Sequence, residues 1–467
     1  MLKIRFLPVL LLLFVSNCLA QSPDDPFPDP IAVTEGVITV GFEEFAVIPD
    51  YEGQAARVMI LVDEPGTGRM FVNDMRGPIY AIGYQGGEGA GYIDINEGRW
   101  GVQVNSGGRE RGMQSFAFHP QFGQPGSPGY GKFYTWTDVA NLAPEPDFVA
   151  DGEGNPHDTV LHEWTARTPG AASYDGDPPR ELMRFEQPFG NHNGGQIGFN
   201  PFAAPGDEDF GLLYVGIADG GSGGDPMGLA QNLRAGFGKI MRIDPLGSDS
   251  ANGRYGIPDT NPFLADPDAL DEIYAYGVRN PQRFAWDPDT GAMYFTDIGQ
   301  NIVEEISPVT SGANLGWNEW EGSFRFISRS EVGLDGPRAD PAVTYPIAEY
   351  GQIDPLLQPQ SAATGLVVYR DGAIPQLQDR ILWGDMPSGE IFHLDADNPP
   401  DGFQSPIRRV LLEVDGQART LLEWVQAKNR EQGRDPAGRA DLRFGVGPDS
   451  QVLIMNKGDG VVRRLVP

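Results

Sequence analysis

The sequence has 467 residues and a formal net charge of −31, which argues against nucleic acid or an anionic membrane surface as a partner. Its single cysteine, Cys18, lies in the N-terminal segment, so the rest of the chain has no thiol nucleophile and no cysteine-ligated metal. On so acidic a protein, an anionic cofactor would need a local cluster of arginine and lysine.

Residues 1–20 have the pattern of a secretory signal peptide. Two basic residues precede an apolar run that is too short to span a bilayer, and Ala20 precedes the expected cleavage site. We therefore expect a periplasmic or secreted protein without membrane insertion. A lipoprotein site at Cys18 fits less well because Asn17 precedes it, and a buried N-terminal strand is the structural alternative. Residues 21–35 are polar and proline-rich and predict a flexible leader.

Short hydrophobic strands, each preceded by a turn with glycine or proline, recur after a first strand predicted at residues 37–47. The six copies are centred on residues 69–72, 132–135, 212–216, 292–295, 380–384 and 451–454. This repetition predicts an all-β, single-domain, six-bladed β-propeller over residues 36–467. Two β-sandwiches would need a linker near the middle, which the sequence lacks. We also expect one short helix at residues 421–430 and long loop insertions at residues 138–180 and 245–272.

Most of the candidate chemistry lies in residues 189–300. His192 precedes a glycine pair, so a turn can present its ring, and the usual pKa of histidine suits a general base. Arg279 and Asn280 place a cation and an amide before a proline that fixes its own φ. Each has a structural alternative: a hydrogen-bonding histidine, as predicted for His119, and an arginine that forms a surface ion pair.

An oxygen-rich segment follows, from Asp297 to Gln300 and on to Glu304 and Glu305. Such a segment suits a hard cation such as Ca²⁺, and an acidic turn is the alternative interpretation.

Motifs in this region resemble the glucose/sorbosone dehydrogenase family, which includes soluble quinoprotein aldose dehydrogenases. They are His-x-Gly-Gly at 192–195, Tyr-Val-Gly at 214–216, Gly-Lys-Ile-x-Arg-Ile-Asp at 238–244, Tyr-Gly-x-Arg-Asn-Pro at 276–281, Asp-x-Gly-Gln at 297–300 and Asn-x-Gly-Trp at 314–317. Each motif is weak alone, but their order and spacing are specific. The resemblance runs from about residue 55 to the C-terminus.

The resemblance implies a sugar dehydrogenase that oxidises the anomeric hydroxyl of an aldose to a lactone, with pyrroloquinoline quinone (PQQ) as hydride acceptor. His192 would be the general base. The implied cofactor-binding residues are Glu110, Asn191, Arg279, Asn280, Arg439 and Arg443. Calcium would be bound by the side chain of Glu305 and by the backbone at Gly299, Gln300 and Leu315. Electrons would pass to an external acceptor, because the chain has no Cys-x-x-Cys-His haem motif.

The sequence departs from the soluble glucose enzyme of this family at two places. The cofactor-binding lysine of that enzyme aligns near Met386 and Pro387, so this cation is missing. The aromatic residues that cover its sugar site have no clear match, and Tyr350 is a possible substitute. Two other functions therefore stay open: a non-catalytic, calcium-stabilised binding propeller that has lost the cofactor, and a propeller lactonase or other hydrolase with a metal in the channel.

Overall fold

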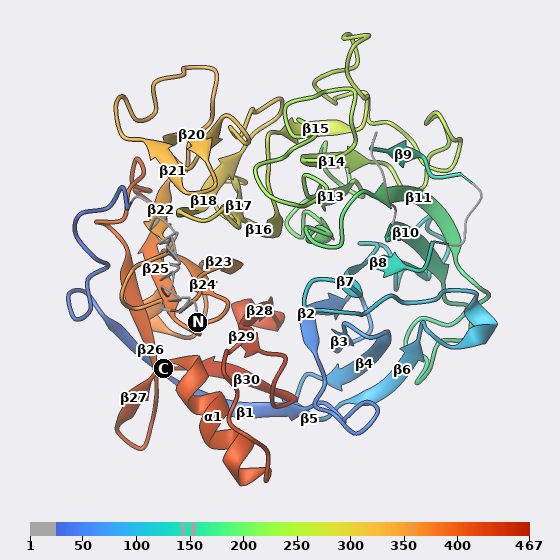
Figure 1. The fold of residues 1–467 in the computed structure, drawn as a ribbon. Coiled ribbons are helices and arrows are strands. Elements are labelled where there is room, and N and C mark those ends of the chain that lie inside the picture. The colour runs from blue at the N-terminus through green and yellow to red at the C-terminus, as the bar shows by residue number, and fades with distance from the viewer. Residues whose placement is uncertain (1–24, 142–144, 151–155, 358) are drawn as a thin grey trace, which may run out of the picture.

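The computed structural model describes residues 25–141, 145–150, 156–357 and 359–467, and these residues form an all-β protein. The expected signal peptide lies outside the described residues. The sheets are arranged around a common centre (Figure 1). In the part of the chain that is described, no helix has the length and apolar character needed to cross a membrane.

The strands nearest the centre are called the inner strands here. They are β2 (Val58–Glu64), β7 (Met113–Phe118), β12 (Ile197–Phe199), β16 (Pro281–Trp286), β23 (Ala363–Tyr369) and β28 (Arg443–Val446). β2 and β28 pair in parallel. One cavity is lined by the C-terminal parts of all the inner strands. The inner strands therefore run in the same direction, and their N-terminal ends lie together at the opposite end of the central axis.

Each inner strand is followed outward by strands that pair in antiparallel order. They are β3 (Arg69–Asp74), β4 (Pro78–Gly83) and β6 (Ala90–Asp94) after β2; β8 (Lys132–Val139), β10 (His157–Thr165) and β11 (Arg180–Gln187) after β7; β13 (Leu213–Ile217), β14 (Lys239–Ile243) and β15 (Ile273–Tyr276) after β12; β17 (Met293–Asp297), β18 (Val303–Val309) and β22 (Ala348–Gly351) after β16; β24 (Arg380–Asp385), β25 (Ile391–Asp395) and β26 (Arg408–Val414) after β23; and β29 (Val452–Met455) and β30 (Val461–Val466) after β28. Short strands complete the set: β5 (Gly87–Glu88), β9 (Phe148–Val149), β19 (Trp320–Glu321), β20 (Phe324–Ser328), β21 (Glu331–Gly333) and β27 (Gln417–Arg419).

The first described strand and the last strands pair in one sheet. β1 (Ile38–Val47) pairs in antiparallel fashion with β30 and in parallel with β26. β1 therefore lies between β26 and β30, in the same sheet as the last strands of the chain (Figure 1).

The hydrophobic core lies between neighbouring sheets rather than at the central axis. One apolar cluster joins Tyr214 and Ile240 of one sheet to Trp286 and Phe295 of the next. The rings of Tyr214 and Trp286 meet edge to face with their centroids 5.3 Å apart. This packing leaves the ends of the inner strands free to carry polar residues.

Two expectations from the sequence need correction. Residues 25–35 of the expected flexible leader pack against the protein: Phe27 and Ile31 are buried, and the Ile31 amide donates to Asp354 Oδ2 at 2.7 Å. The expected insertion at 138–180 contains β10, which pairs with β8 and β11, so part of it belongs to a sheet. The expected loop at 245–272 holds no strand.

The expected short helix is confirmed as α1 (Leu421–Glu431), the one α-helix of the described residues. Thr420 and Glu423 form a capping box at its start, and Leu421 and Val425 are buried on its inner face.

Candidate active site

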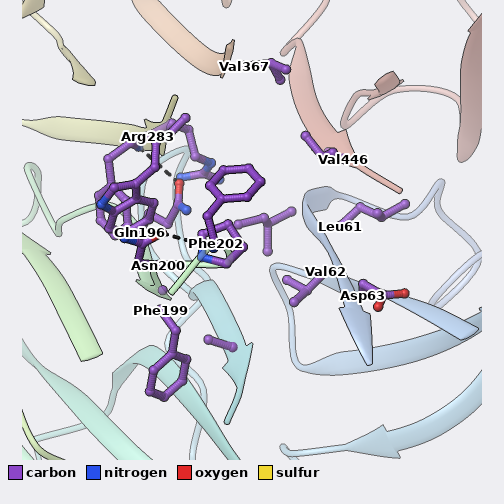
Figure 2. Close-up of a pocket in the computed structure, with 18 of the residues that line it drawn as sticks. Leu61, Val62, Asp63, Gln196, Phe199, Asn200, Phe202, Arg283, Val367 and Val446 are labelled. Atoms are coloured by element: carbon purple, nitrogen blue, oxygen red, sulfur yellow. Dashed lines mark hydrogen bonds between the residues drawn. The ribbon is translucent and has the colours of Figure 1, made fainter. Parts of the chain in front are cut away.

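The predicted site residues precede different inner strands. Glu110 comes before β7, His192 before β12, and Arg279 and Asn280 directly before β16, while Arg443 is the first residue of β28. Because the inner strands share one direction, these residues meet at one end of the central axis. The large cavity of Figure 2 lies at the other end.

His192 is held between an acid and a guanidinium. It has φ 57° and is buried. Its Nδ1 lies 2.7 Å from Asp219 Oδ1, and its Nε2 lies 3.0 Å from Arg279 Nη2. Because arginine can only donate, Nε2 must accept, and the ring proton is then on Nδ1 and donated to Asp219. The site therefore holds the neutral tautomer with its basic nitrogen on the Arg279 side.

Asp219, which sequence analysis missed, follows β13 and is buried. It also accepts hydrogen bonds from the Gly221 amide and from Trp317 Nε1, both at 2.9 Å. Burial raises the pKa of Asp219, but its interaction with His192, the charge of Arg279 and the hydrogen bond from the Gly221 amide outweigh burial and lower it below its usual value. Asp219 therefore stays ionised and fixes the histidine ring.

Arg279 is fixed by neighbouring oxygen atoms. Its Nη1 donates to the Ile298 carbonyl at 2.7 Å and its Nη2 to Gln300 Oε1 at 3.3 Å. The carboxylate of Asp297 accepts from the backbone amides of Arg279 at 2.7 Å and Asn280 at 2.6 Å. The guanidinium also lies 5.6 Å from the centroid of the Trp317 ring. This arrangement presents a cation beside the basic nitrogen of His192.

The two residues that directly precede β16 each have one buried polar atom without a hydrogen-bond partner among the described residues. These atoms are Nε of Arg279 and the side-chain oxygen of Asn280. Buried polar groups are nearly always hydrogen-bonded, so an unpaired pair at this position indicates room for a polar ligand.

Glu110 and Asn191 support the turn that carries His192. Glu110 Oε2 accepts from the His192 amide at 2.8 Å. Asn191 Oδ1 accepts from the Ser222 amide at 3.0 Å, and its Nδ2 donates to the Ser222 carbonyl at 3.3 Å. Glu110 Oε2 and the side-chain amide of Asn191 thus bind within the protein.

Comparison with known proteins identifies the family of this chain. The family model for glucose/sorbosone dehydrogenase matches residues 69–423. The chain belongs to the glucose/sorbosone dehydrogenase family. The HIPL1 protein of Arabidopsis thaliana is 28% identical over 395 residues, which cover 77% of this chain and 55% of that protein. The chain thus spans about half the length of the first curated relatives that it matches.

Two solved structures share the fold. The apo form of the soluble aldose sugar dehydrogenase from Escherichia coli has a TM-score of 0.62 and 17% identity, covering 91% of this chain and 98% of that one. The PQQ-bound aldose sugar dehydrogenase from Streptomyces coelicolor has a TM-score of 0.56 and 17% identity, covering 89% and 97%.

A basic cluster, defined as Arg57, Arg443 and Lys457, lies beside the family motifs. None of the three forms an ion pair with a carboxylate of the described residues. A cavity of about 220 Å³ is lined by Arg57, Arg109, Asp441 and Lys457, with Gln54 and Ala55. Lys457 Nζ donates to the Arg109 carbonyl at 3.1 Å, and the next residue, Glu110, binds the His192 backbone. The basic cluster is therefore close to His192.

The cation missing from the family pattern belongs to the same neighbourhood. The Met386 carbonyl accepts from the Leu442 amide at 3.2 Å, and the Pro387 carbonyl accepts from the Ala440 amide at 2.8 Å. Arg439, predicted as a cofactor ligand, pairs with Asp441 at 2.6 Å. Lys457 and Arg57 thus bring cations close to the place where the sequence alignment loses one.

Burial lowers the pKa of Arg443 to about 10, and burial together with Arg443 lowers that of Lys457. A lowered pKa is expected for cations that are buried close together without enough negative charge around them.

The predicted calcium residues do not assemble a carboxylate site. Glu305 is buried, and its oxygens already accept from the Gly322 amide at 3.3 Å and the Ser307 hydroxyl at 3.2 Å. Burial, with the charges of Asp297 and Glu349, raises the pKa of Glu305. Within the described ranges, no group of three His, Cys, Asp or Glu residues could hold a metal ion.

The other calcium residues lie in the same region of the fold. Gly299 and Gln300 follow β17, and the Gly299 carbonyl accepts from Gln352 Nε2 at 3.3 Å. The Leu315 amide donates to the Tyr276 carbonyl at 2.8 Å. A site built mainly from backbone carbonyls stays a prediction.

Tyr350 and His119 have structural places. Tyr350, the possible substitute for the aromatic residues of the sugar site, is fully buried in β22, with its ring centroid 5.6 Å from that of Phe392, so its ring has a structural place in the core. His119 Nδ1 accepts from the Gln121 amide at 3.1 Å in a turn, which agrees with its predicted structural role.

Proposed function

We propose that this chain is a quinoprotein dehydrogenase that oxidises the anomeric hydroxyl of an aldose to a lactone. The observation that carries the proposal is the line from Asp219 through His192 to Arg279, with hydrogen-bond distances of 2.7 and 3.0 Å. Such a line suits removal of a hydroxyl proton beside a centre where negative charge develops. Family membership and the fold shared with aldose sugar dehydrogenases support the substrate class.

Each residue of the line has a role in this reaction. Nε2 of His192 takes the proton of the anomeric hydroxyl. Asp219 keeps the opposite ring nitrogen protonated and stabilises the imidazolium that results. PQQ, when bound, supplies the acceptor for the hydride. The Arg279 guanidinium stabilises the negative charge that develops as the hydride is transferred.

The residues present fit such a cofactor. The unpaired Nε–H of Arg279 can donate to a quinone oxygen, and the unpaired Oδ1 of Asn280 can accept from an N–H or O–H group of a bound ligand. The basic cluster would hold the carboxylates, since charged groups without partners are costly when buried. A protein with a net charge of −31 needs a local excess of cations for this purpose.

The proposal includes finer features. We infer six blades, one for each inner strand with the strands that follow it. β1 would complete the last blade and hold the ring closed. We further propose export by the N-terminal signal, transfer of electrons to an external acceptor, and a calcium ion near Glu305 and the Gly299 carbonyl.

Reconstitution tests the function. The chain without residues 1–20 is mixed with Ca²⁺ and PQQ, and reduction of a dye is followed with a panel of aldoses. His192→Ala should abolish turnover and still bind PQQ. Lys457→Met should weaken PQQ binding by about tenfold, measured from the absorbance of the quinone. Lys428→Met, which alters an α1 lysine paired with Glu44, is the matched control.

The outcomes separate the alternatives. No saturable PQQ binding would contradict the dehydrogenase and favour a binding protein without cofactor. Equal PQQ affinity in the Lys457 and Lys428 variants would contradict only the role of the basic cluster and would leave the proposed dehydrogenase reaction standing.

A further inference from the structure

The end of the central axis opposite His192 holds a second cavity that the proposed reaction does not use. Its volume is about 640 Å³. Apolar side chains from the inner strands line it, among them Leu61, Phe199, Val367 and Val446. In Figure 2, Arg283, Gln196 and Phe202 lie on one side, and Leu61 and Val446 lie across from them.

The mouth of this cavity is apolar and open to solvent. Phe202 is 51% exposed and Val446 is 46% exposed, and both line the cavity. Large exposed apolar residues around a hollow are a feature of binding sites for apolar ligands.

Arg283 gives the cavity a charged floor. It is 4% exposed, and within the described residues its Nη1 and Nη2 donate only to the backbone carbonyls of Gln282 and Met59, at 2.5 and 2.7 Å. Its Nε is buried and has no partner among these residues. It forms no ion pair with any carboxylate in the described part of the chain.

A second guanidinium increases the positive charge at this floor. The parallel pairing of Leu61 with Gly445 places Met59, which accepts from Arg283, opposite Arg443. Burial and the charge of Arg443 lower the pKa of Arg283, so the two cations interact. Arg283 is buried beside a second cation and has no ion-pair partner among the described carboxylates, which is unfavourable, and an anion at Arg283 would offset that cost.

The nearest lining carboxylate, Asp63, lies toward the mouth. It is four residues further along β2 than Met59, or about 13 Å. Its Oδ1 accepts from the Tyr84 hydroxyl at 2.7 Å. The floor is therefore the cationic part of the cavity, and the wall between floor and mouth is apolar.

We propose that this cavity binds an anionic amphiphile: a small monocarboxylate whose carboxylate pairs with Arg283 and whose apolar body lies against Phe202, Val367 and Val446. The site is separate from His192, so it does not depend on the proposed dehydrogenase reaction. Its ligand enters from the face opposite to the sugar.

Calorimetric titration of the full mature chain with sodium octanoate tests the site, with 1-octanol as the uncharged partner of the same length. Octanoate should bind saturably and at least about tenfold more tightly than octanol, because a buried charged hydrogen bond discriminates by that amount. Arg283→Met should remove this preference. Arg325→Met, which alters an exposed arginine of β20, should retain it.

Val446→Asp provides a second test that leaves the floor intact. The lost apolar contact at the mouth should weaken binding of both ligands, and the added negative charge should weaken octanoate binding more than octanol binding. Absence of saturable octanoate binding, equal affinity for octanol, or unchanged octanoate affinity in both Arg283→Met and Val446→Asp would overturn the proposal. None of these results depends on PQQ.

Discussion

Asp219 determines the state of His192 more directly than any residue of the sequence motifs. It receives the Nδ1 proton, and the Gly221 amide and Trp317 Nε1 hold it in place. The basic nitrogen of His192 can then face only Arg279 and whatever binds beside it. At the scale of single residues, the site is an orienting acid, a base and a cation.

Asp219→Asn tests this arrangement. An amide can donate to the ring, which allows the other tautomer and removes the charge that stabilises imidazolium. We expect the turnover rate of the reconstituted enzyme to fall by about a hundredfold or more while PQQ affinity changes little. The rate as a function of pH and the PQQ affinity are the two measurements.

Asp225→Asn is the matched control for this substitution. Asp225 is also buried, and among the described residues its side chain accepts hydrogen bonds only from the Leu229 and Ala230 amides. An equal loss of rate in both variants would mean that Asp219 acts through the fold rather than through His192.

Helix α1 illustrates what local sequence contributes at the scale of elements. Thr420 Oγ1 accepts from the Glu423 amide, and Glu423 Oε2 accepts from the Thr420 amide at 3.0 Å. Leu421 and Val425 bury the inner face. The capping box and the spacing of these apolar residues are local, which explains why the helix was predictable, although Leu421 and Val425 pack in a cluster with residues far away in the chain.

Thr420→Ala should lower the free energy of unfolding by about 1 kcal/mol, because the first turn loses one satisfied amide. Urea denaturation followed by circular dichroism measures this difference. Ser311→Ala, at an exposed turn position, should change it by less than about 0.5 kcal/mol. A loss at Thr420 no greater than that at Ser311 would show that the capping box does not contribute.

The whole molecule depends on contacts between residues far apart in the chain. β1, the first described strand, pairs with β26 and β30, which lie near the C-terminal end of the chain.

Buried polar groups between the sheets also make global stability depend on pH. Three histidines, His119, His162 and His393, have pKa values lowered to about 4 by burial.

The sign of this dependence follows from His162. Burial lowers its pKa from 6.5 to about 4, so between these pH values the unfolded chain binds the extra proton and the folded protein does not. Its contribution is complete above pH 6.5 and is lost as the pH falls toward 4. The loss from this one group is at most roughly 3 kcal/mol.

His162→Gln should therefore flatten the decrease in unfolding free energy between pH 6.5 and 4. The dependence between pH 7 and 9 should match that of the unchanged protein, which serves as an internal control. Chemical denaturation at a series of pH values measures both ranges. An unchanged slope in the acidic range would contradict the assignment.

The sequence by itself determined the all-β class, helix α1 and the family, because strand periodicity, turn residues and motif order are local properties of the chain. It also supplied His192, Arg279 and Asn280 as candidates, which the structure brings together. Only the tertiary structure placed Asp219 on His192 and Lys457 beside Arg57, because these pairs come from different parts of the chain. It also packed residues 25–35 onto the sheets and buried Tyr350. Which side chains are buried, and which ones meet, depends on how the inner strands are arranged around the central axis. No single stretch of sequence contains that arrangement.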